Sequence, residues 1–209
     1  VLTTSRADYG LLRHLMEEIR GDRSCRLQVV ACGSHLSRAH GLTVREIEAD
    51  GFSVAARVPT VAAQDTLEAS AAALGRAMES FARAFARLKP DLLIVLGDRQ
   101  ELLPACSAAV LLRVPIAHLH GGEATEGVLD EQVRHAVTKL AHLHFPAAEP
   151  YRRRLIRMGE DPRRVFAFGA PGLDAIRAMK PLLDATLEKK LGLRLGGHLA
   201  LLTFHPTAL

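Results

Sequence analysis

The stretch LGDRQELLPACSAAVLLRVPIAHLHGGEATEGVLDEQVRH, residues 96–135, contains the end of one apolar run and the whole of a second. The two runs, DLLIVLG and VPIAHLH, have the length and continuous apolar character of strands that are covered on both faces. Each stops abruptly at polar residues: Asp98 and Arg99 follow the first run, while His120 and Glu123 stand at the end of the second. The segment LLPACSAAVLLR between the runs predicts a helix, and strand, helix and strand in succession indicate a parallel sheet.

The same alternation extends from this stretch in both directions. VLTT, CRLQVVACG and FSVAARV predict strands before it, and HLHF and VFAFG predict strands after it, with helices between them. The pattern is typical of a doubly wound, Rossmann-like α/β domain, here up to about residue 169. LDAIRAMKPLLDATLEKKLGL then predicts a helical connector that Pro181 interrupts, and HLALLTFHP opens a new strand. Because the chain starts inside one apolar run and ends just after another, we expect it to be part of a longer protein.

A long alanine-rich helix is predicted from Asp65, in TLEASAAALGRAMESFARAFARLKP, and Pro90 marks its end. Its apolar residues recur at helical spacing, which indicates a stripe that is packed in the core or at a subunit interface. The stripe consists of Leu67, Leu74, Met78, Phe81, Phe85 and Leu88. The small alanine face allows close helix packing, so this helix is the candidate contact of a homo-oligomer.

Composition limits the classes of function that the chain can have. The 209 residues are 48% hydrophobic and carry a net charge of +4, which suits one substantial core and an anionic small ligand. With two Tyr, seven Phe and no Trp, little aromatic surface is available for stacking on bases, so we do not expect nucleic-acid binding. The sequence contains no signal peptide and no apolar run long enough to span a bilayer, so we expect a cytoplasmic location without a membrane partner.

Two polar turns near the N-terminus are candidates for ligand contact. In SRADYG, Arg6 stands before the amphipathic helix LLRHLMEEIR, where free backbone N–H groups and the helix dipole favour phosphates. Arg6 is therefore either an anion-binding residue or a solvated loop charge. In GSHLSRAHG, His35 follows a strand on the ligand side of a doubly wound sheet, unless it is an incidental loop histidine. The next helix, TVREIEADG, starts from Thr43 with Glu46 placed as in a capping box.

The polar residues of the opening stretch suit two different chemistries. Asp130 opens a helix, where the helix dipole stabilises its charge even without a catalytic role. In the first chemistry, carboxylates exchange protons with a substrate carbon and a leaving-group oxygen, while arginines hold an anionic leaving group. In the second, His118 and His120, two residues apart on one face of a strand, join Glu123 or Asp130 around a metal ion that activates water. A hydrogen-bonded core histidine is the alternative for His118.

Several motifs, taken in order along the chain, resemble one enzyme family. They are TSRADYGLLRHLM, GSHLS, DGF, LGDRQE, HLHGGEATEGVLDEQVRHAVTKLAHLHF, YRRRLIRMGEDPRRVFAFGAPGLD and TFHP. Together they resemble the hydrolysing UDP-N-acetylglucosamine (UDP-GlcNAc) 2-epimerases of sialic acid and related nonulosonic acid synthesis. The resemblance implies two Rossmann-like domains in the manner of the GT-B fold, with the active site in the cleft between them. It makes residues 1–169 the first domain, residues 170–197 the connector, and residues 198–209 the first strand of a truncated C-terminal nucleotide-binding domain.

The resemblance also implies a reaction and roles for residues. UDP-GlcNAc loses its C2 proton and expels UDP, giving 2-acetamidoglucal, to which water adds with inversion at C2 to release N-acetylmannosamine. Asp98 and Asp130 match the acid/base carboxylates of the family, and Arg6 and Arg99 match residues that hold the UDP phosphates or the neighbouring sugar. His205, in TFHP, matches a second-domain histidine near the phosphates.

The resemblance leaves the assignment of one proton-transfer role open. Some members carry a glutamate, in HIEGGE, where this chain has His120, so either His120 or Glu123 takes that role. Arg134 and His35 are further candidates for substrate binding. The elimination route requires no metal and no nicotinamide cofactor.

The substrate and the class of protein also have alternatives. UDP-GlcNAc is the expected substrate, with UDP-N,N′-diacetylbacillosamine or a GDP-linked sugar as alternatives, and the relatives are homodimers or homotetramers. A metal-dependent hydrolase that uses His118, His120 and Glu123 is an alternative from another class. A catalytically silent nucleotide-sugar-binding module is a third, but it has no need of Asp98, Glu123 and Asp130 together.

Overall fold

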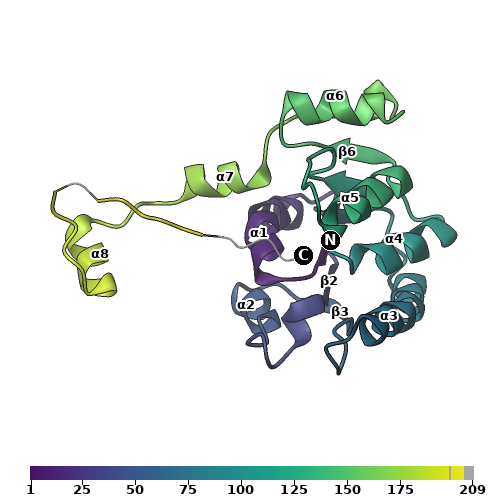
Figure 1. The fold of residues 1–209 in the computed structure, drawn as a ribbon, viewed down its shortest axis with the longest axis horizontal. Coiled ribbons are helices and arrows are strands. Elements are labelled where there is room, and N and C mark those ends of the chain that lie inside the picture. The colour runs from purple at the N-terminus through teal and green to yellow at the C-terminus, as the bar shows by residue number, and fades with distance from the viewer. Residues whose placement is uncertain (198, 205–209) are drawn as a thin grey trace.

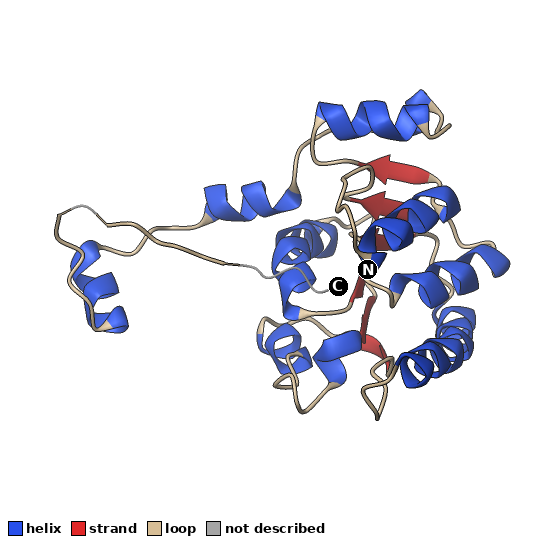
Figure 2. Ribbon diagram, viewed as in Figure 1, coloured by secondary structure: helices blue, strands red, loops and turns tan. Residues whose placement is uncertain are grey.

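The computed structural model, which describes residues 1–197 and 199–204, is a parallel α/β fold with helices on both faces of its strands (Figures 1 and 2). The strands form two three-stranded parallel sheets in the orders β1-β2-β3 and β4-β5-β6, and β1 contacts β4. The strand order therefore reverses between β1 and β4, which is the position where doubly wound sheets bind ligands. The strands are β1 (Leu2–Thr3), β2 (Val29–Cys32), β3 (Val54–Val58), β4 (Leu93–Leu96), β5 (Ile116–Leu119) and β6 (Leu143–Phe145).

The helices cover the two faces of the sheet with two separate apolar clusters. One cluster packs α3, α4 and α5 on the strands and includes Phe81 and Phe85, while the other packs α1 and α2 on the opposite face and includes Leu12 and Ile47. The helices are α1 (Arg6–Gly21), α2 (Val44–Ala49), α3 (Leu67–Leu88), α4 (Leu102–Leu111), α5 (Leu129–Leu140), α6 (Glu149–Arg157), α7 (Pro171–Ala178) and α8 (Asp184–Leu191), with short 3₁₀ turns η1 (Gly33–Leu36) and η2 (Pro162–Arg164). Burial of both strand faces explains the continuous apolar runs in the sequence.

The turn between β1 and α1 is fixed by a buried carboxylate. Asp8 accepts hydrogen bonds from the backbone N–H groups of Thr4 (2.7 Å) and Ser5 (2.6 Å) and from the Ser5 hydroxyl (2.8 Å). These bonds satisfy donors that the start of a helix leaves without partners. The backbone around Arg6 is therefore held in place at the edge of the sheet.

The alanine face of α3 is used inside the molecule. Ala73, Ala77 and Ala84 are buried, and α3 packs along α4. Leu67, which the sequence places in the apolar stripe, is 90% exposed because the helix begins with it. The buried alanines thus serve the close α3–α4 contact, and an oligomer contact on this helix would have to use its other residues.

Two local predictions from the sequence are wrong. Thr43 does not cap α2 with its side chain, because its hydroxyl is hydrogen-bonded to the ring of His35 (2.7 Å). VFAFG is not a full strand: Val165 forms an isolated parallel bridge with His144, and the Phe166 N–H donates to the His144 carbonyl (2.8 Å). The chain leaves the sheet after this contact, so the bridge does not extend into a seventh strand.

The segment after residue 169 contains the two helices expected of a connector. α7 packs against α1, and α8 lies farther from the sheet (Figure 1). Residues 199–204, the described part of the predicted last strand, are not paired in a sheet. His205 lies outside the described residues. None of the helices in the described parts of the chain has the length and apolar character that a membrane crossing requires.

Candidate active site

The carboxyl end of β4 is linked to α5 by an ion pair. Asp98 follows β4, and its carboxylate accepts a hydrogen bond from Nη2 of Arg134, which is only 5% exposed. Nη1 of Arg134 donates to the Thr125 hydroxyl (2.9 Å), so one guanidinium holds both the strand end and the loop before α5. Burial lowers the pKa of Arg134. Two residues predicted for different roles, Asp98 for catalysis and Arg134 for substrate binding, are therefore direct partners.

His118 forms a second link between the same elements. Its Nε2 lies 2.7 Å from the Gly97 carbonyl oxygen, and its Nδ1 lies 3.2 Å from the Thr138 hydroxyl on α5. Because a carbonyl can only accept, Nε2 carries the hydrogen and the Thr138 hydroxyl donates to Nδ1. Complete burial lowers the pKa of His118 to about 4, so the ring is neutral at physiological pH. The structure therefore confirms the hydrogen-bonded core histidine that the sequence offers as the alternative to a metal ligand, and it adds the two partners, Gly97 and Thr138.

The two glycines of HGGE are required by close packing. A Cβ on Gly121 would lie 3.0 Å from Nδ1 of His118, so this backbone rests directly on the buried ring. Gly122 has a φ of +80°, and a Cβ there would lie 2.6 Å from the Tyr151 carbonyl oxygen on α6. Only glycine combines this conformation with this approach of two backbones. The turn that carries His120 and Glu123 is therefore pressed between β5 and α6.

His120 and Glu123 form a pair at the end of β5. Nδ1 of His120 lies 2.7 Å from Oε1 of Glu123, and the two side chains are 17% and 27% exposed. The backbone N–H of His120 donates to the Phe145 carbonyl at the end of β6 (3.0 Å). Since the Gly97 N–H donates to the Leu119 carbonyl (3.0 Å), the positions of Asp98 and His120 lie on neighbouring strand ends. The two strand ends that carry these residues are therefore adjacent, while their convergence on one substrate stays a prediction.

Asp130 lies in the first turn of α5 and is exposed. It precedes Arg134 by four residues, which places both on the same face of the helix. Glu131 turns to another partner, with Oε1 lying 3.3 Å from Nε2 of His135. Asp130 therefore lies one helical turn before Arg134, the ion-pair partner of Asp98.

The two candidate phosphate-binding arginines stand on either side of the strand-order reversal. Arg6 begins α1 after β1, and its side chain has no ion-pair partner within the described residues. Arg99 follows β4, is half exposed, and its Nε lies 3.7 Å from Oε2 of Glu101. These positions match those expected of residues that meet an anion at the edge of the sheet.

Glu101 is a buried carboxylate that the sequence did not single out. It is 4% exposed, and within the described residues its Oε2 has no hydrogen-bond partner. It lies against Gly33, where a Cβ would be 2.9 Å from Oε1 of Glu101 and 2.3 Å from the Thr4 carbonyl oxygen. The ends of β1, β2 and β4 therefore meet around this side chain, and its place in LGDRQELL, directly before an apolar helix, is the only sequence signal of its burial.

The side chain of His35, for which the sequence predicts contact with a ligand, is turned into the core. The residue is fully buried, with Nε2 lying 2.9 Å from the Thr3 hydroxyl and Nδ1 lying 2.7 Å from the Thr43 hydroxyl. Burial also lowers the pKa of His35. The histidine supports the loop between β2 and α2 from within, and neither ring nitrogen is free for a substrate atom.

The metal-dependent alternative lacks one of its ligands. Both ring nitrogens of His118 are engaged by Gly97 and Thr138, as described above. Within residues 1–197 and 199–204, no three or more His, Cys, Asp or Glu side chains are grouped closely enough to hold a metal ion.

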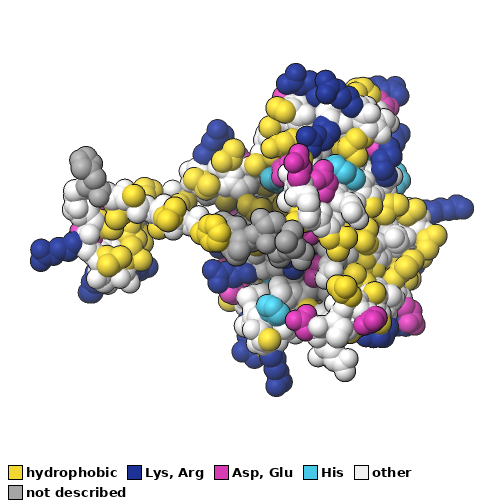
Figure 3. All heavy atoms as spheres, in the orientation of Figure 1, with side chains coloured by type: hydrophobic (Ala, Val, Ile, Leu, Met, Phe, Trp, Pro, Cys, Tyr) yellow, Lys and Arg dark blue, Asp and Glu magenta, His cyan; other side chains and the backbone are white. Residues whose placement is uncertain are grey.

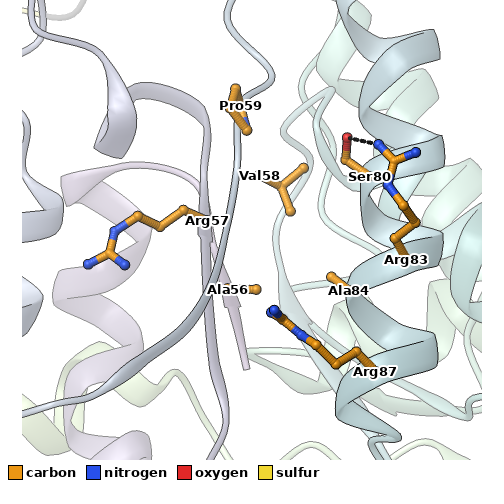
Figure 4. A pocket seen from close by; sticks show the side chains of 8 residues that line it. All are labelled: Ala56, Arg57, Val58, Pro59, Ser80, Arg83, Ala84 and Arg87. Carbon is orange, nitrogen blue, oxygen red and sulfur yellow. Dashed lines mark hydrogen bonds between the residues drawn. The ribbon is translucent and has the colours of Figure 1, made fainter.

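Two other surface features lie outside these contacts. Basic side chains gather over α6, whose sequence EPYRRRLIR contains four arginines (Figure 3). A hollow lies between the edge strand β3 and α3 (Figure 4), and none of the candidate residues lines it. There Arg87 donates to the Ala55 carbonyl (3.2 Å), which covers part of the free edge of the sheet. Edge strands are commonly protected in this way against unwanted pairing.

Comparison with known proteins agrees with this arrangement. The sequence matches the UDP-N-acetylglucosamine 2-epimerase family over residues 17–209. It is 39% identical over 209 residues to the GDP/UDP-N,N′-diacetylbacillosamine 2-epimerase (hydrolyzing) of Campylobacter jejuni, covering 100% of this chain and 54% of the relative. It is 40% identical over 205 residues to the UDP-N,N′-diacetylbacillosamine 2-epimerase (hydrolyzing) of Legionella pneumophila, covering 98% and 54%. The chain therefore spans about half the length of these relatives.

Solved structures share the fold at low sequence identity. The UDP-GlcNAc 2-epimerase of Neisseria meningitidis, bound to UDP-GlcNAc, superimposes with a TM-score of 0.73 at 16% identity, covering 91% of this chain and 50% of that one. The enzyme of Methanocaldococcus jannaschii gives a TM-score of 0.70 at 15% identity, covering 83% and 46%. The expected Rossmann-like fold is thereby confirmed. Its family match, its relatives and its fold agree, and the chain belongs to the UDP-N-acetylglucosamine 2-epimerase family.

Proposed function

We propose that this chain is part of a hydrolysing nucleotide-sugar 2-epimerase. One observation carries the proposal: in a chain of this family, Asp98 and the His120–Glu123 pair occupy the ends of neighbouring strands β4 and β5. Groups that accept and donate protons at one edge of a sheet suit a reaction that moves protons at a carbon atom. Asp130, exposed on the adjoining helix, adds a second carboxylate.

The proposed reaction has two steps. First, a base removes the proton from C2 of the sugar, the C2–H electrons form a C1=C2 double bond, and the C1–O bond breaks so that the nucleoside diphosphate leaves with its electron pair. Water then adds to C1 while C2 receives a proton from the opposite face, which inverts C2 and releases the free sugar. Asp98, the His120–Glu123 pair and Asp130 supply the proton-transfer groups, and Arg134 orients the Asp98 carboxylate.

Arg6 and Arg99 are proposed to hold the departing diphosphate. Arg6 stands at the N-terminal end of α1, where the helix dipole favours negative charge. Arg99 approaches the same edge from β4, with Glu101 beside its guanidinium. Positive charges at the leaving group stabilise the charge that develops on the phosphate oxygen as the C1–O bond breaks. Contact of His205 with the phosphates from the second domain stays a prediction.

We propose a UDP-linked 2,4-diacetamido sugar of the N,N′-diacetylbacillosamine type as the substrate. The relatives named for this sugar are 39% and 40% identical, whereas the UDP-N-acetylglucosamine 2-epimerase of Neisseria meningitidis is 29% identical over 188 residues. UDP-GlcNAc, giving N-acetylmannosamine, is the second candidate, and a GDP-linked sugar is the third. The proposed class of reaction is the same for all three.

The organisation of the complete protein is also proposed from the family. Residues 1–169 form a Rossmann-like domain, residues 170–197 a helical connector, and residues 198–209 begin a second, nucleotide-binding domain. Homodimers or homotetramers are the proposed assemblies. Size-exclusion chromatography with light scattering on the complete protein tests the assembly, and a monomer at micromolar concentration contradicts it.

The function is tested with the complete protein and three substrates in parallel: UDP-N,N′-diacetylbacillosamine, UDP-GlcNAc and a GDP-linked sugar. NMR identifies the released sugar, and the reaction is run in heavy water. We expect UDP release with inversion at C2, deuterium at C2 of the product, and the largest kcat/KM for the diacetamido sugar. Release of the nucleotide without deuterium at C2 would contradict proton abstraction there.

The metal-dependent hydrolase is distinguished by chelation. In the elimination route, protein side chains alone move the protons, so we expect full activity after dialysis against a strong chelator. Loss of activity that added zinc restores would favour the hydrolase instead.

A further inference from the structure

The tautomer of His120 follows from its contact with Glu123. The ionised carboxylate of Glu123 can only accept hydrogen bonds, so Nδ1 of His120, 2.7 Å away, carries the hydrogen. Nε2 of the neutral ring is then unprotonated and can accept a proton. The pair has the arrangement in which a carboxylate orients an imidazole base.

Nε2 of His120 is enclosed and has no hydrogen-bond partner within residues 1–197 and 199–204. Buried polar atoms are nearly always satisfied, and one left unsatisfied at a site often has a catalytic role. The backbone of His120 also has a φ of +61°, a conformation that is uncommon in residues other than glycine. The packing of Gly122 on α6 already fixes the turn. A purely structural role of His120 in this turn therefore does not account for a ring nitrogen without a hydrogen-bond partner.

Resting on the function proposed above, we propose that His120 is the catalytic base at C2 and that Glu123 is its positioning residue. Nε2 of His120 takes the C2 proton, the C2–H electron pair becomes the C1=C2 bond, and the nucleoside diphosphate leaves with the electrons of the C1–O bond. The imidazolium that forms keeps its Nδ1–H bond to the Glu123 carboxylate, which stabilises the positive charge. The delivery of a proton to the opposite face then belongs to the carboxylates Asp98 and Asp130.

The neighbouring groups support this division of roles. Oε1 of Glu123 is already engaged by Nδ1 of His120, so the carboxylate is the less available acceptor. His118 lies beneath the turn on β5, and burial lowers its pKa to about 4, so this ring is neutral at physiological pH. His144 lies beside it on β6, where burial lowers its pKa and its Nε2 lies 3.0 Å from Oε2 of Glu160, so it is engaged away from His120. Glu123 is therefore the charged neighbour that stabilises a protonated His120.

The test compares Glu123 in two backgrounds of the complete protein. A glutamate at position 120 is a proton acceptor that needs no partner to select its tautomer. We therefore expect Glu123→Gln to lower kcat about 10- to 100-fold when His120 is present, and less than about threefold in the His120→Glu background. His120→Ala should lower kcat by about 10²- to 10⁴-fold, as loss of a general base does. Glu126→Gln, on the exposed part of the same loop, is the matched control and should be unchanged.

Two further measurements separate catalysis from loop structure. Wash-in of deuterium at C2 should slow in parallel with kcat, while KM changes little, because the base acts on the reacting carbon. In His120→Glu the acid limb of the kcat profile should move to lower pH, since a carboxyl group titrates about two pH units below an imidazole. Circular dichroism and thermal melting establish that each variant is folded.

The outcomes distinguish the two proposals. If the parent protein processes no nucleotide sugar, the proposed function fails. If the parent is active but Glu123→Gln costs the same in both backgrounds, Glu123 has only a structural role and the dyad is wrong. Near-normal turnover by folded His120→Ala would also overturn the dyad while leaving the epimerase function standing.

Discussion

The guanidinium of Arg134 forms an ion pair with the carboxylate of Asp98, joining the buried face of α5 to the end of β4. The same helix carries Asp130 one turn earlier, and the same arginine holds Thr125 in the loop between HGGE and the helix. Arg134 therefore helps to set the positions of the two candidate carboxylates relative to each other, together with the His118 link between β4 and α5. Its loss affects both the stability of the chain and the geometry of the candidate site.

Replacement of Arg134 by methionine should be strongly destabilising. It leaves the Asp98 carboxylate, whose side chain is only 20% exposed, without its partner. We expect the free energy of unfolding in urea to fall by about 3 kcal/mol, as when one partner of a buried pair is removed. The control is Arg83→Met, which breaks the exposed pair with Glu79 and should cost less than about 1 kcal/mol. An equal decrease in the free energy of unfolding in the two variants would show that burial of the Arg134–Asp98 pair contributes nothing to stability.

Asp130→Asn should abolish turnover while leaving stability nearly unchanged. The side chain is exposed at the start of α5, so loss of its charge costs only the helix-dipole term, about 0.3–1 kcal/mol. UDP release measured by a coupled assay should fall at least 100-fold in the complete protein. Near-normal turnover by this variant would remove Asp130 from the set of proton-transfer groups.

His118 should make the chain less stable as the pH falls from about 6.5 to about 4. Its pKa is lowered to about 4 by burial, so between these values the unfolded chain binds a proton that the folded chain does not. The contribution, about 3 kcal/mol, is fully present above pH 6.5 and is lost as the pH falls to 4. His35 and His144 act in the same direction, because burial lowers their pKa values too.

Urea unfolding at pH 7 and pH 5 tests this contribution. His118→Gln should show a smaller decrease in unfolding free energy between the two pH values than the parent chain. His40→Gln is the control, because His40 is exposed. A decrease as large in His118→Gln as in the parent would refute the assignment of the pH dependence to His118.

Gly122→Ala should be far more destabilising than Gly127→Ala. Both glycines have a positive φ, +80° and +82°, so each alanine carries the same backbone penalty of about 1–2 kcal/mol. Only at Gly122 would the added Cβ meet the Tyr151 backbone, at 2.6 Å; at Gly127 the added Cβ would have no described residue within 4 Å apart from its chain neighbours. Thermal melting of the two variants measures the difference, and similar melting temperatures would show that α6 moves away at no cost.

Much of the fold could be predicted from the sequence because it follows from local pattern. Continuous apolar runs such as DLLIVLG indicate strands covered on both faces, and helical spacing between them indicates crossovers. VFAFG was predicted to be a strand by the same rule, but only Val165 reaches the sheet. Whether an apolar run pairs or departs is decided by the neighbouring strand, which local pattern does not include.

The partners of the site residues were harder to predict. The strand ends place Asp98 near His120, but the ion pair of Asp98 with Arg134 joins residues 36 positions apart. The sequence predicts His35 at a ligand, but the side chain lies between Thr3 and Thr43, and nothing in the loop sequence marks Glu101, which is buried where three strands end. A polar side chain in a loop sequence gives no indication of whether it points outward or inward.

By itself, the sequence determined the parallel α/β fold, the two strand ends that carry polar residues, and the resemblance to the epimerase family. These properties depend on residue type and spacing, which are written in the chain. Only the tertiary structure decided that Arg134 belongs to Asp98, that His118 is a neutral link between β4 and α5, and that Glu123 holds Nδ1 of His120 and leaves Nε2 unpaired. Such pairings depend on distance and burial, because a hydrogen bond forms only where packing brings a donor and an acceptor within about 3 Å.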